Sequence, residues 1–259
     1  MNINQIVDTD KHDLSSALFA SKCKQMLDEQ GVLSLNSFLT ERALEQLQIE
    51  SLAGQPKAYF CTQNHTTYLS PPDQQFADDH PRNRMVESSK GCICDDAIAQ
   101  TSVLRVLYDS DDFRSFIAIV TGEQEIHPYA DPLSSINIHY AEREQELGWH
   151  FDNSSFAITL LIQKPTNGSL FEFVKDLRDA EIGDMNFQGV GELLDGVTKP
   201  EVLPMEPGTL VLFRGRNSIH RVSPNESDVT RILAVLAYNS KPGVELSENA
   251  RMTFYGRLG

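Results

Sequence analysis

The chain has few cysteines, no excess of basic residues and no long apolar run. It contains four cysteines, scattered apart from Cys92 and Cys94, whereas a structural zinc site usually shows two paired half-sites. Lys and Arg number 22 against 37 Asp and Glu, and the formal net charge of −15 would repel nucleic-acid phosphates and anionic membranes. No stretch reaches the roughly 20 apolar residues of a membrane span, and the first residues lack the features of a secretory signal. We therefore expect a cytoplasmic protein with reduced thiols that binds neither nucleic acid nor membrane.

The first half of the chain has the pattern of helices interrupted by one long loop region. Apolar residues recur at helical spacing over residues 13–30, and Gly31 provides a stop. A short strand pattern follows, and then Thr40 is a candidate N-cap for the next helix. Residues 54–91 are rich in Pro, Gln, Asn, His and Asp, which predicts a long loop with one hairpin. Residues 95–120 predict two helices separated near Ser110.

The second half has the pattern of β-strands. Alternating or continuous apolar runs between turn signals predict strands at 135–140, 156–163, 169–174, 209–214 and 231–239. A polar insertion at about 175–207 predicts a short helix and loops on the rim of a barrel. Helices first and strands afterwards favour an α+β fold, with a double-stranded β-helix (jelly roll, cupin-like) core and N-terminal helices packed on one sheet. We expect one domain over 1–259, divided into a helical N-terminal region with a long active-site loop (1–130) and a jelly-roll catalytic core (131–259).

The stretch WHFDNS, at residues 149–154, carries the main chemical signal. Residues two apart in a strand point to the same face, so His150 and Asp152 would project together while Phe151 packs on the other side. A second histidine, His220, follows the predicted strand 209–214. Two histidines and one carboxylate with open coordination positions form the facial triad of non-heme Fe(II) oxygenases. We predict that these three residues are catalytic and bind Fe(II).

The order of these residues resembles that of the Fe(II)/2-oxoglutarate-dependent oxygenases, in which His-x-Asp is followed by a distant His and then by an Arg. Here Arg231 begins the strand after His220. The phrases WHFDNSSFA, PGTLVLFRG, NSIHRV and AVLAY are similar to a smaller subgroup of free-amino-acid hydroxylases and halogenases and related ring-forming enzymes. The resemblance covers roughly residues 130–243. It implies Fe(II) as the cofactor, with 2-oxoglutarate as cosubstrate and O2 as the oxidant.

The resemblance also implies how 2-oxoglutarate is held. Arg231 would clamp its distal carboxylate, because a planar guanidinium donates two parallel hydrogen bonds. The apolar run that follows Arg231 predicts a buried strand, and a buried arginine needs an anionic partner. Asn137 and His139 share one face of the predicted strand 135–140, and we expect both to contact 2-oxoglutarate. A one-residue bulge would bring Tyr140 inward instead.

The expected activity is hydroxylation of an unactivated C–H bond in a small metabolite, a free amino acid or a derivative, with release of succinate and CO2. Halogenases of the subgroup have Gly or Ala at the carboxylate position, whereas this chain has Asp152. Desaturation, ring closure and protein side-chain hydroxylation at the same site stay open, as does a non-catalytic jelly-roll binding protein. Arg82 and Arg84 in the long loop either bind an acidic group of the substrate or are solvated.

Overall fold

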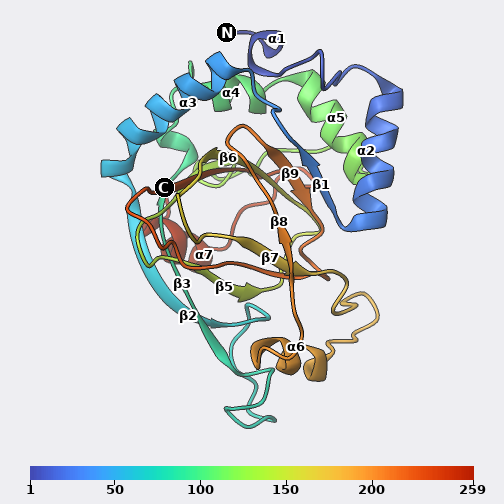
Figure 1. Cartoon of the computed structure of the whole chain (residues 1–259), viewed down its shortest axis with the longest axis vertical. Helices are drawn as coiled ribbons and strands as arrows, with labels where there is room; N and C mark the ends of the chain where they lie inside the picture. The colour runs from blue at the N-terminus through green and yellow to red at the C-terminus, as the bar shows by residue number, and fades with distance from the viewer.

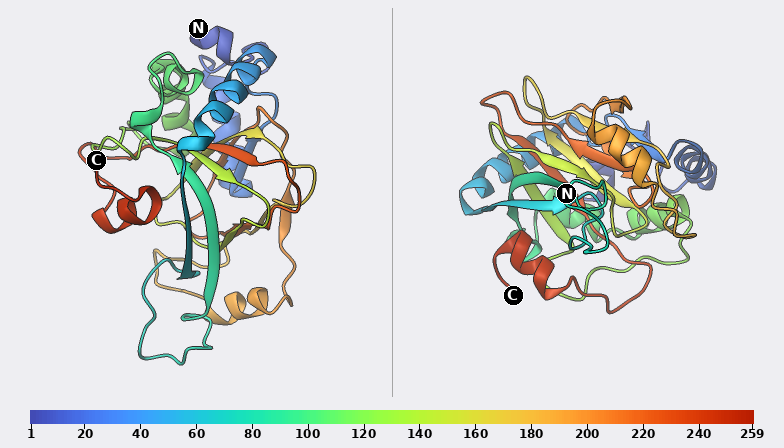
Figure 2. Two further views of the ribbon diagram at one scale, coloured as in Figure 1. Left: turned by 90° about the vertical axis from the view of Figure 1, so that its left-hand side faces the viewer. Right: turned by 90° about the horizontal axis from the view of Figure 1, so that it is seen from below.

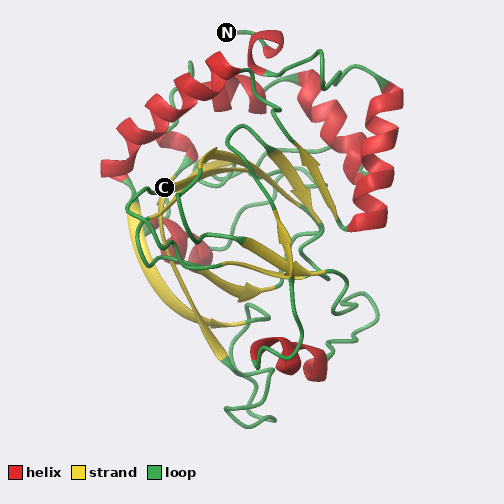
Figure 3. Ribbon diagram, in the orientation of Figure 1, coloured by secondary structure: helices red, strands yellow, loops and turns green.

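A curled antiparallel sheet forms the centre of the computed structural model, which describes all residues from 1 to 259, and most helices lie at one side of it (Figures 1 and 3). The strands are β1 (Val32–Leu35), β2 (Tyr59–Thr66), β3 (Met85–Ile93), β4 (Ile136–Ala141), β5 (Leu147–His150), β6 (Ala157–Gln163), β7 (Phe171–Val174), β8 (Glu201–Leu203), β9 (Leu210–Phe213), β10 (Ile219–Val222) and β11 (Arg231–Leu236). The helices are α1 (Ile3–Ile6), α2 (Ala17–Gln30), α3 (Glu41–Gly54), α4 (Val103–Tyr108), α5 (Asp111–Thr121), α6 (Phe187–Leu194) and α7 (Glu248–Tyr255), with 3-10 turns at Gln55–Lys57 and Asp95–Ala97.

The strand order explains how one sheet closes around an interior. The order is β1-β9-β6-β11-β4-β3-β5-β10-β7-β8, and β2 pairs with β3. Strand β3 joins the two halves, because Gly91 pairs with Tyr140 of β4 whereas Ser88 pairs with Leu147 of β5. The halves formed by β4, β11, β6 and β9 and by β5, β10, β7 and β8 curl toward each other. The predicted α+β fold with a double-stranded β-helix core is confirmed.

Side-chain alternation along β11 separates the outer core from the interior. Ile232, Ala234 and Leu236 belong to the large core cluster beneath the N-terminal helices. Leu233 faces the other way and packs in a smaller cluster with Phe213 and other residues between the two halves of the sheet. Because β11 is covered on both faces, its sequence is a continuous apolar run rather than an alternating one. The expected packing of N-terminal helices on one sheet is confirmed.

The predicted helix ends are determined by capping residues. The side chain of Thr40 accepts a hydrogen bond from the backbone N–H of Ala43, and Ser110 caps α5 in the same way. Gly31 ends α2 in the left-handed region at φ 72°. Helix α2 begins four residues later than the sequence pattern predicts, because Ser16 is its N-cap.

The region 54–91 contains the predicted hairpin, but it is more ordered than the long loop expected around it. Its two ends are the long strands β2 and β3, which pair over eight residues each, and only residues 67–84 connect them as a loop. Figure 2 shows this hairpin running from the helical layer to the opposite end of the molecule. Most side chains of β2 are exposed or half-buried. Its sequence therefore lacks the alternation of apolar and polar residues that is typical of a strand. Since β1, β2 and β3 belong to the sheet, the β-core is not confined to residues 131–259.

The remaining differences concern short elements. The predicted insertion at about 175–207 does contain a helix, α6, and it also supplies the edge strand β8. The sequence pattern did not predict β10, in which His220 and Arg221 interrupt the apolar residues. Strand β5 ends at His150, whereas the strand geometry expected from the sequence extended to Asp152. None of the helices has the length and hydropathy that a membrane span requires.

Candidate active site

The three predicted metal ligands meet at the ends of short strands. His150 is the last residue of β5 and pairs in register with His220 of β10. Asp152 lies in the turn after β5 rather than in the strand itself, and its backbone N–H donates to the carbonyl oxygen of Gly215, at 3.0 Å. Phe151 points away into a buried cluster, as predicted. The ligand atoms of the three residues lie within 4.8 Å of one another.

Backbone hydrogen bonds orient both imidazoles toward the same point. Nδ1 of His150 donates to the carbonyl oxygen of Gly148 at 2.8 Å, and Nδ1 of His220 donates to that of Ser218 at 3.2 Å. Because a carbonyl only accepts, each Nε2 keeps its lone pair. These Nε2 atoms lie 3.8 and 3.7 Å from Oδ1 of Asp152. Burial, and then the adjacent His220 ring, lowers the pKa of His150 well below its usual value.

The carboxylate of Asp152 shows that this donor set suits a cation. Its Oδ2 is buried and has no hydrogen-bond partner within the protein. A buried charged oxygen left without a partner is costly, and a metal ion is the partner that two neutral imidazoles and one carboxylate share. The His-Asp-His triad therefore fits an iron site.

Residues that the sequence did not single out support the triad. The ring of Phe213 lies 4.8 Å from that of His220. The ring of His65 meets that of His150 edge-on at 6.2 Å, and its Nε2 lies 2.7 Å from the hydroxyl of Ser88. That hydroxyl also accepts from the backbone N–H of Gly148 at 2.9 Å. His65 lies on β2, in the region predicted as loop, so its proximity to the triad could not be read from the sequence.

Two cations, the buried Arg231 and the half-buried Lys90, face the interior without an acidic partner. Arg231 is 8% exposed and forms no side-chain hydrogen bond or ion pair with the protein. Burial lowers its pKa to about 10. The ammonium group of Lys90 lies 3.2 Å from Nδ1 and 3.3 Å from Nε2 of His139, and 5.2 Å from the ring centre of Phe254. Burial, Lys90 and then Arg231 lower the pKa of His139 well below its usual value, which keeps this imidazole neutral.

The register of the sheet explains why these cations converge. Arg231 pairs with Ala141 across β11 and β4. Gly91 pairs with Tyr140, so Lys90 lies beside Ala141 on the opposite side of β4. A small residue between two long cationic ones leaves space over β4. Lys90 was not among the predicted site residues, because its strand was predicted as loop.

The predicted contact residue Asn137 lines a cavity of about 160 Å³, together with Lys90 and His139. Both hydrogens of its amide are used, since Nδ2 donates to the carbonyl oxygens of Leu133 and Ile136 at 2.8 and 2.7 Å. Its Oδ1 accepts from the hydroxyl of Tyr255 at 2.8 Å. Asn137 therefore has no free donor for a carboxylate, so this arrangement does not favour the predicted contact.

Tyr140 does not turn inward. Its hydroxyl donates to the carbonyl oxygen of Ser51 on α3 at 2.8 Å, so the alternative of a bulge in β4 is not realised. The two loop arginines already have partners in the protein, although Nη1 of Arg82 is buried without a hydrogen bond. Arg84 pairs with Asp195 at 2.6 Å, and Arg82 donates to the carbonyl oxygen of Pro71 at 3.1 Å.

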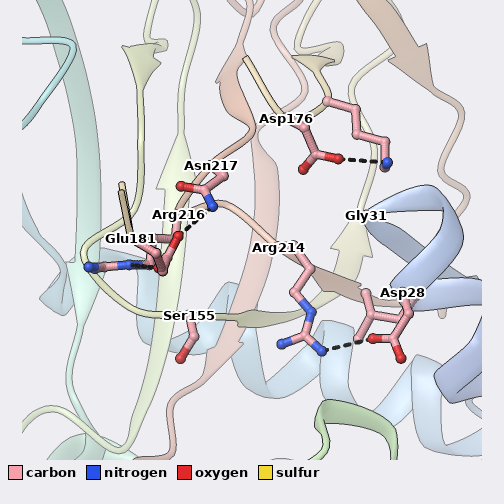
Figure 4. Close-up of a pocket in the computed structure, with 10 residues that line it drawn as sticks. Asp28, Gly31, Ser155, Asp176, Glu181, Arg214, Arg216 and Asn217 are labelled. Atoms are coloured by element: carbon pink, nitrogen blue, oxygen red, sulfur yellow. Dashed lines mark hydrogen bonds and ion pairs between the residues drawn. The ribbon is translucent and has the colours of Figure 1, made fainter. Parts of the chain in front are cut away.

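A polar cleft of about 340 Å³ lies beside the turn that follows β9 (Figure 4). Its cations are paired with acids, with Arg216 bound to Glu181 at 2.8 Å and Arg214 bound to Asp28 at 3.1 Å. Glu181 also accepts from the amide of Asn217, and these contacts lower its pKa to about 2. The cleft therefore lacks the unpaired charge that marks the interior.

Comparison with known families identifies the class of protein. The family described as Halogenase D matches residues 70–253, more than two thirds of the chain, so the chain belongs to that family. It is thereby an enzyme of the 2-oxoglutarate and Fe(II)-dependent oxygenase superfamily. No curated protein sequence matches the chain.

Solved structures of this superfamily share the fold. An oxygenase of the 2OG-Fe(II) family from Burkholderia pseudomallei is 14% identical, with a TM-score of 0.54 over 87% of this chain and 93% of that chain. The epimerase SnoN, in complex with Fe3+, alpha ketoglutarate and nogalamycin RO, is 10% identical, with a TM-score of 0.58 over 86% and 84%. A Pseudomonas putida prolyl-4-hydroxylase is 11% identical, with a TM-score of 0.52 over 83% and 97%. At least one structurally similar enzyme, SnoN, thus binds iron together with alpha ketoglutarate.

Proposed function

We propose that this protein is a non-heme Fe(II)- and 2-oxoglutarate-dependent dioxygenase that hydroxylates an unactivated C–H bond of a small, amino-acid-like metabolite. One atom of O2 enters the substrate as a hydroxyl group. The other enters succinate, which forms from 2-oxoglutarate with loss of CO2. The observation that carries this proposal is the triad of His150, Asp152 and His220 with its unpartnered buried carboxylate oxygen.

In this proposal His150, Asp152 and His220 hold the iron through Nε2, a carboxylate oxygen and Nε2. The bound iron would supply the activation of O2 coupled to decarboxylation of 2-oxoglutarate. The protein contributes position: backbone carbonyls hold each imidazole tautomer, and strand pairing fixes the distance between the two rings. Packed aromatic rings such as that of Phe213 exclude water from one side of His220.

Arg231 is proposed to bind the distal carboxylate of 2-oxoglutarate. Its burial without an acidic partner supports this role, because a dicarboxylate would provide the missing negative charge. Lys90 is close enough to the same region to add a second positive charge, and neutral His139 offers one further N–H donor.

The presence of Asp152 favours hydroxylation over halogenation, although the family is described as a halogenase family. In the subgroup that the sequence resembles, halogenases lack this carboxylate and chloride takes its position on iron. A carboxylate anion already in place leaves neither the vacancy nor the net positive charge that would attract a halide.

A small, amino-acid-like substrate is proposed from the subgroup that the sequence resembles, which contains hydroxylases of free amino acids. The ammonium group of Lys90 would suit a substrate carboxylate as well as a cosubstrate. The cytoplasmic location expected from the cysteines stays a prediction.

Two measurements test the proposal. Anaerobic addition of Fe(II) and 2-oxoglutarate should produce a weak visible metal-to-ligand charge-transfer band, which requires the iron to chelate the keto acid, and a non-catalytic jelly roll would show none. Succinate release is then screened across amino acids and dipeptides in excess chloride. Mass spectrometry should find products heavier by one oxygen atom. A chlorine isotope doublet in the wild-type product would overturn the assignment to hydroxylation.

A further inference from the structure

Gly215 occupies the turn between β9 and β10, directly beneath the carboxylate of Asp152. A Cβ atom built at this position would lie 2.6 Å from Cγ of Asp152 and closer still to Oδ2. It would also lie 3.0 Å from Cε1 of His220. The carboxylate thus occupies the space that any other residue at 215 would fill.

The backbone at Gly215 does not itself demand glycine. Gly215 is not among the glycines with positive φ, so an alanine is compatible with its conformation. The two chain segments also cannot separate easily, because the carbonyl oxygen of Gly215 accepts the backbone N–H of Asp152 at 3.0 Å. The only conflict that a methyl group would introduce is with the side chains above it.

We propose that Gly215 is a positioning residue that reserves the space in which the Asp152 carboxylate reaches the metal. The inference rests on the proposed function as far as the metal is concerned. A side chain at 215 would leave Asp152 in the sequence but displace its carboxylate from the triad. The carboxylate is 20% exposed and has a route toward solvent, so the chain can fold with it displaced. The residue type at position 215 therefore affects whether the carboxylate of Asp152 can reach the metal.

A double-mutant cycle tests this inference with the full chain. The four proteins are the wild type, Gly215→Ala, Asp152→Gly and the double variant. Binding of Mn(II), which needs neither O2 nor turnover, is measured by calorimetry. Unfolding temperature is measured in chelator, where no metal contributes. The Asp152→Gly background serves as the matched control, because it removes the group that the added methyl would displace.

In the Asp152 background, Gly215→Ala should weaken Mn(II) binding about 10- to 100-fold, the range for residues that orient metal ligands. In the Asp152→Gly background, which lacks one of the three metal ligands, the effect of the same change is read from the unfolding temperature in chelator, which it should leave nearly unchanged, as for substitutions that do not interact. The unfolding temperature in chelator should therefore fall with Gly215→Ala only when Asp152 is present. Any residual effect in the Asp152→Gly background measures the contact with His220.

Wild-type Mn(II) affinity in Gly215→Ala, or equal losses of unfolding temperature in both backgrounds, would overturn the inference. If Gly215→Ala fails to fold, the double variant should fold, and failure of both would assign Gly215 to backbone packing instead. If the wild type binds no Mn(II), the proposed metal site fails. The chelated unfolding temperatures then still decide the steric inference, because the conflict with Asp152 exists without metal.

Discussion

Arg231 carries a buried positive charge that no acidic group of the folded chain balances, and its replacement by methionine should have opposite effects on stability and on 2-oxoglutarate binding. Burial lowers the pKa of this guanidinium to about 10. At about 1.4 kcal/mol per pH unit, the charged form costs the folded state about 3 kcal/mol. Methionine keeps most of the apolar stem and removes the charge, so the free energy of unfolding of the ligand-free protein should rise by up to this amount.

The sign of this effect depends on pH. The pKa of Arg231 is lower in the folded protein than in the unfolded chain. Below about pH 10 the arginine is charged in both states, and its charge destabilises the folded state. This destabilisation is therefore fully present at pH 7. The free energy of unfolding of the wild type rises as the pH increases above the pKa of Arg231 in the folded protein, because the guanidinium then loses its charge there. The stabilisation by methionine should be largest near neutral pH, should shrink above pH about 10, and corresponds to roughly 6–12 °C in unfolding temperature for a chain of this size.

The affinity for 2-oxoglutarate should change in the other direction. Removing one partner of a buried charge-assisted pair costs roughly 2–5 kcal/mol, or about 30- to 4,000-fold in Kd. Unfolding is followed in chelator at pH 7, and binding is followed by anaerobic titration of the charge-transfer band. Arg42→Met, at an exposed position on α3, is the control and should change neither quantity. A variant that is less stable than wild type without ligand, or an unchanged Kd, would refute the reasoning.

Three further predictions concern the other groups of the site. His150→Ala or His220→Ala should abolish succinate release and weaken Mn(II) binding by at least about 100-fold while circular dichroism stays that of the wild type; full 2-oxoglutarate turnover by either variant would contradict the metal assignment. Asp152→Asn should lose the stabilisation that Mn(II) gives the wild type, because a neutral amide replaces the carboxylate ligand; a rise in unfolding temperature with Mn(II) equal to that of the wild type would place this carboxylate outside the metal site. Lys90→Met should weaken 2-oxoglutarate binding about tenfold, the loss expected for one hydrogen bond to a charged group. The weaker binding of 2-oxovalerate, which lacks the distal carboxylate, should stay unchanged. Equal losses for both ligands would place Lys90 away from that carboxylate.

The sequence revealed the triad because its signal is local and chemical. His150 and Asp152 are two residues apart. His220 and Arg231 follow in the order typical of the Fe(II)/2-oxoglutarate-dependent oxygenases, and Arg231 directly precedes an apolar run. The continuous apolar run of β11 likewise predicted a buried strand, since all five residues that follow Arg231 in the strand are apolar. The His-x-Asp spacing and the apolar run after Arg231 each involve residues that are close in the sequence, so both could be recognised without knowledge of the fold.

Contacts between segments that are distant in the sequence could not be predicted in this way. Lys90 and His65 reach the interior only because β2 and β3 form a long hairpin whose mostly polar side chains hide its strand character. The alternation of β4 placed Asn137 on the interior face, but not the carbonyl oxygens and the Tyr255 hydroxyl that occupy its amide. A period-two pattern gives the direction of a side chain but not its hydrogen-bond partners, one of which, Tyr255, lies on helix α7, more than a hundred positions further along the chain.

The distribution of charge connects the fold to its chemistry. The chain as a whole has a net charge of −15, which opposes the approach of a dianion such as 2-oxoglutarate. Inside the sheet the balance is reversed, because Arg231 and Lys90 face the same interior as the triad and carry no acidic partners. Asp152 contributes the negative charge of the triad, and its loss would make the interior more positive by one charge. If the proposed function holds, the space above Gly215 would favour hydroxylation when it contains a carboxylate and halide binding when it does not.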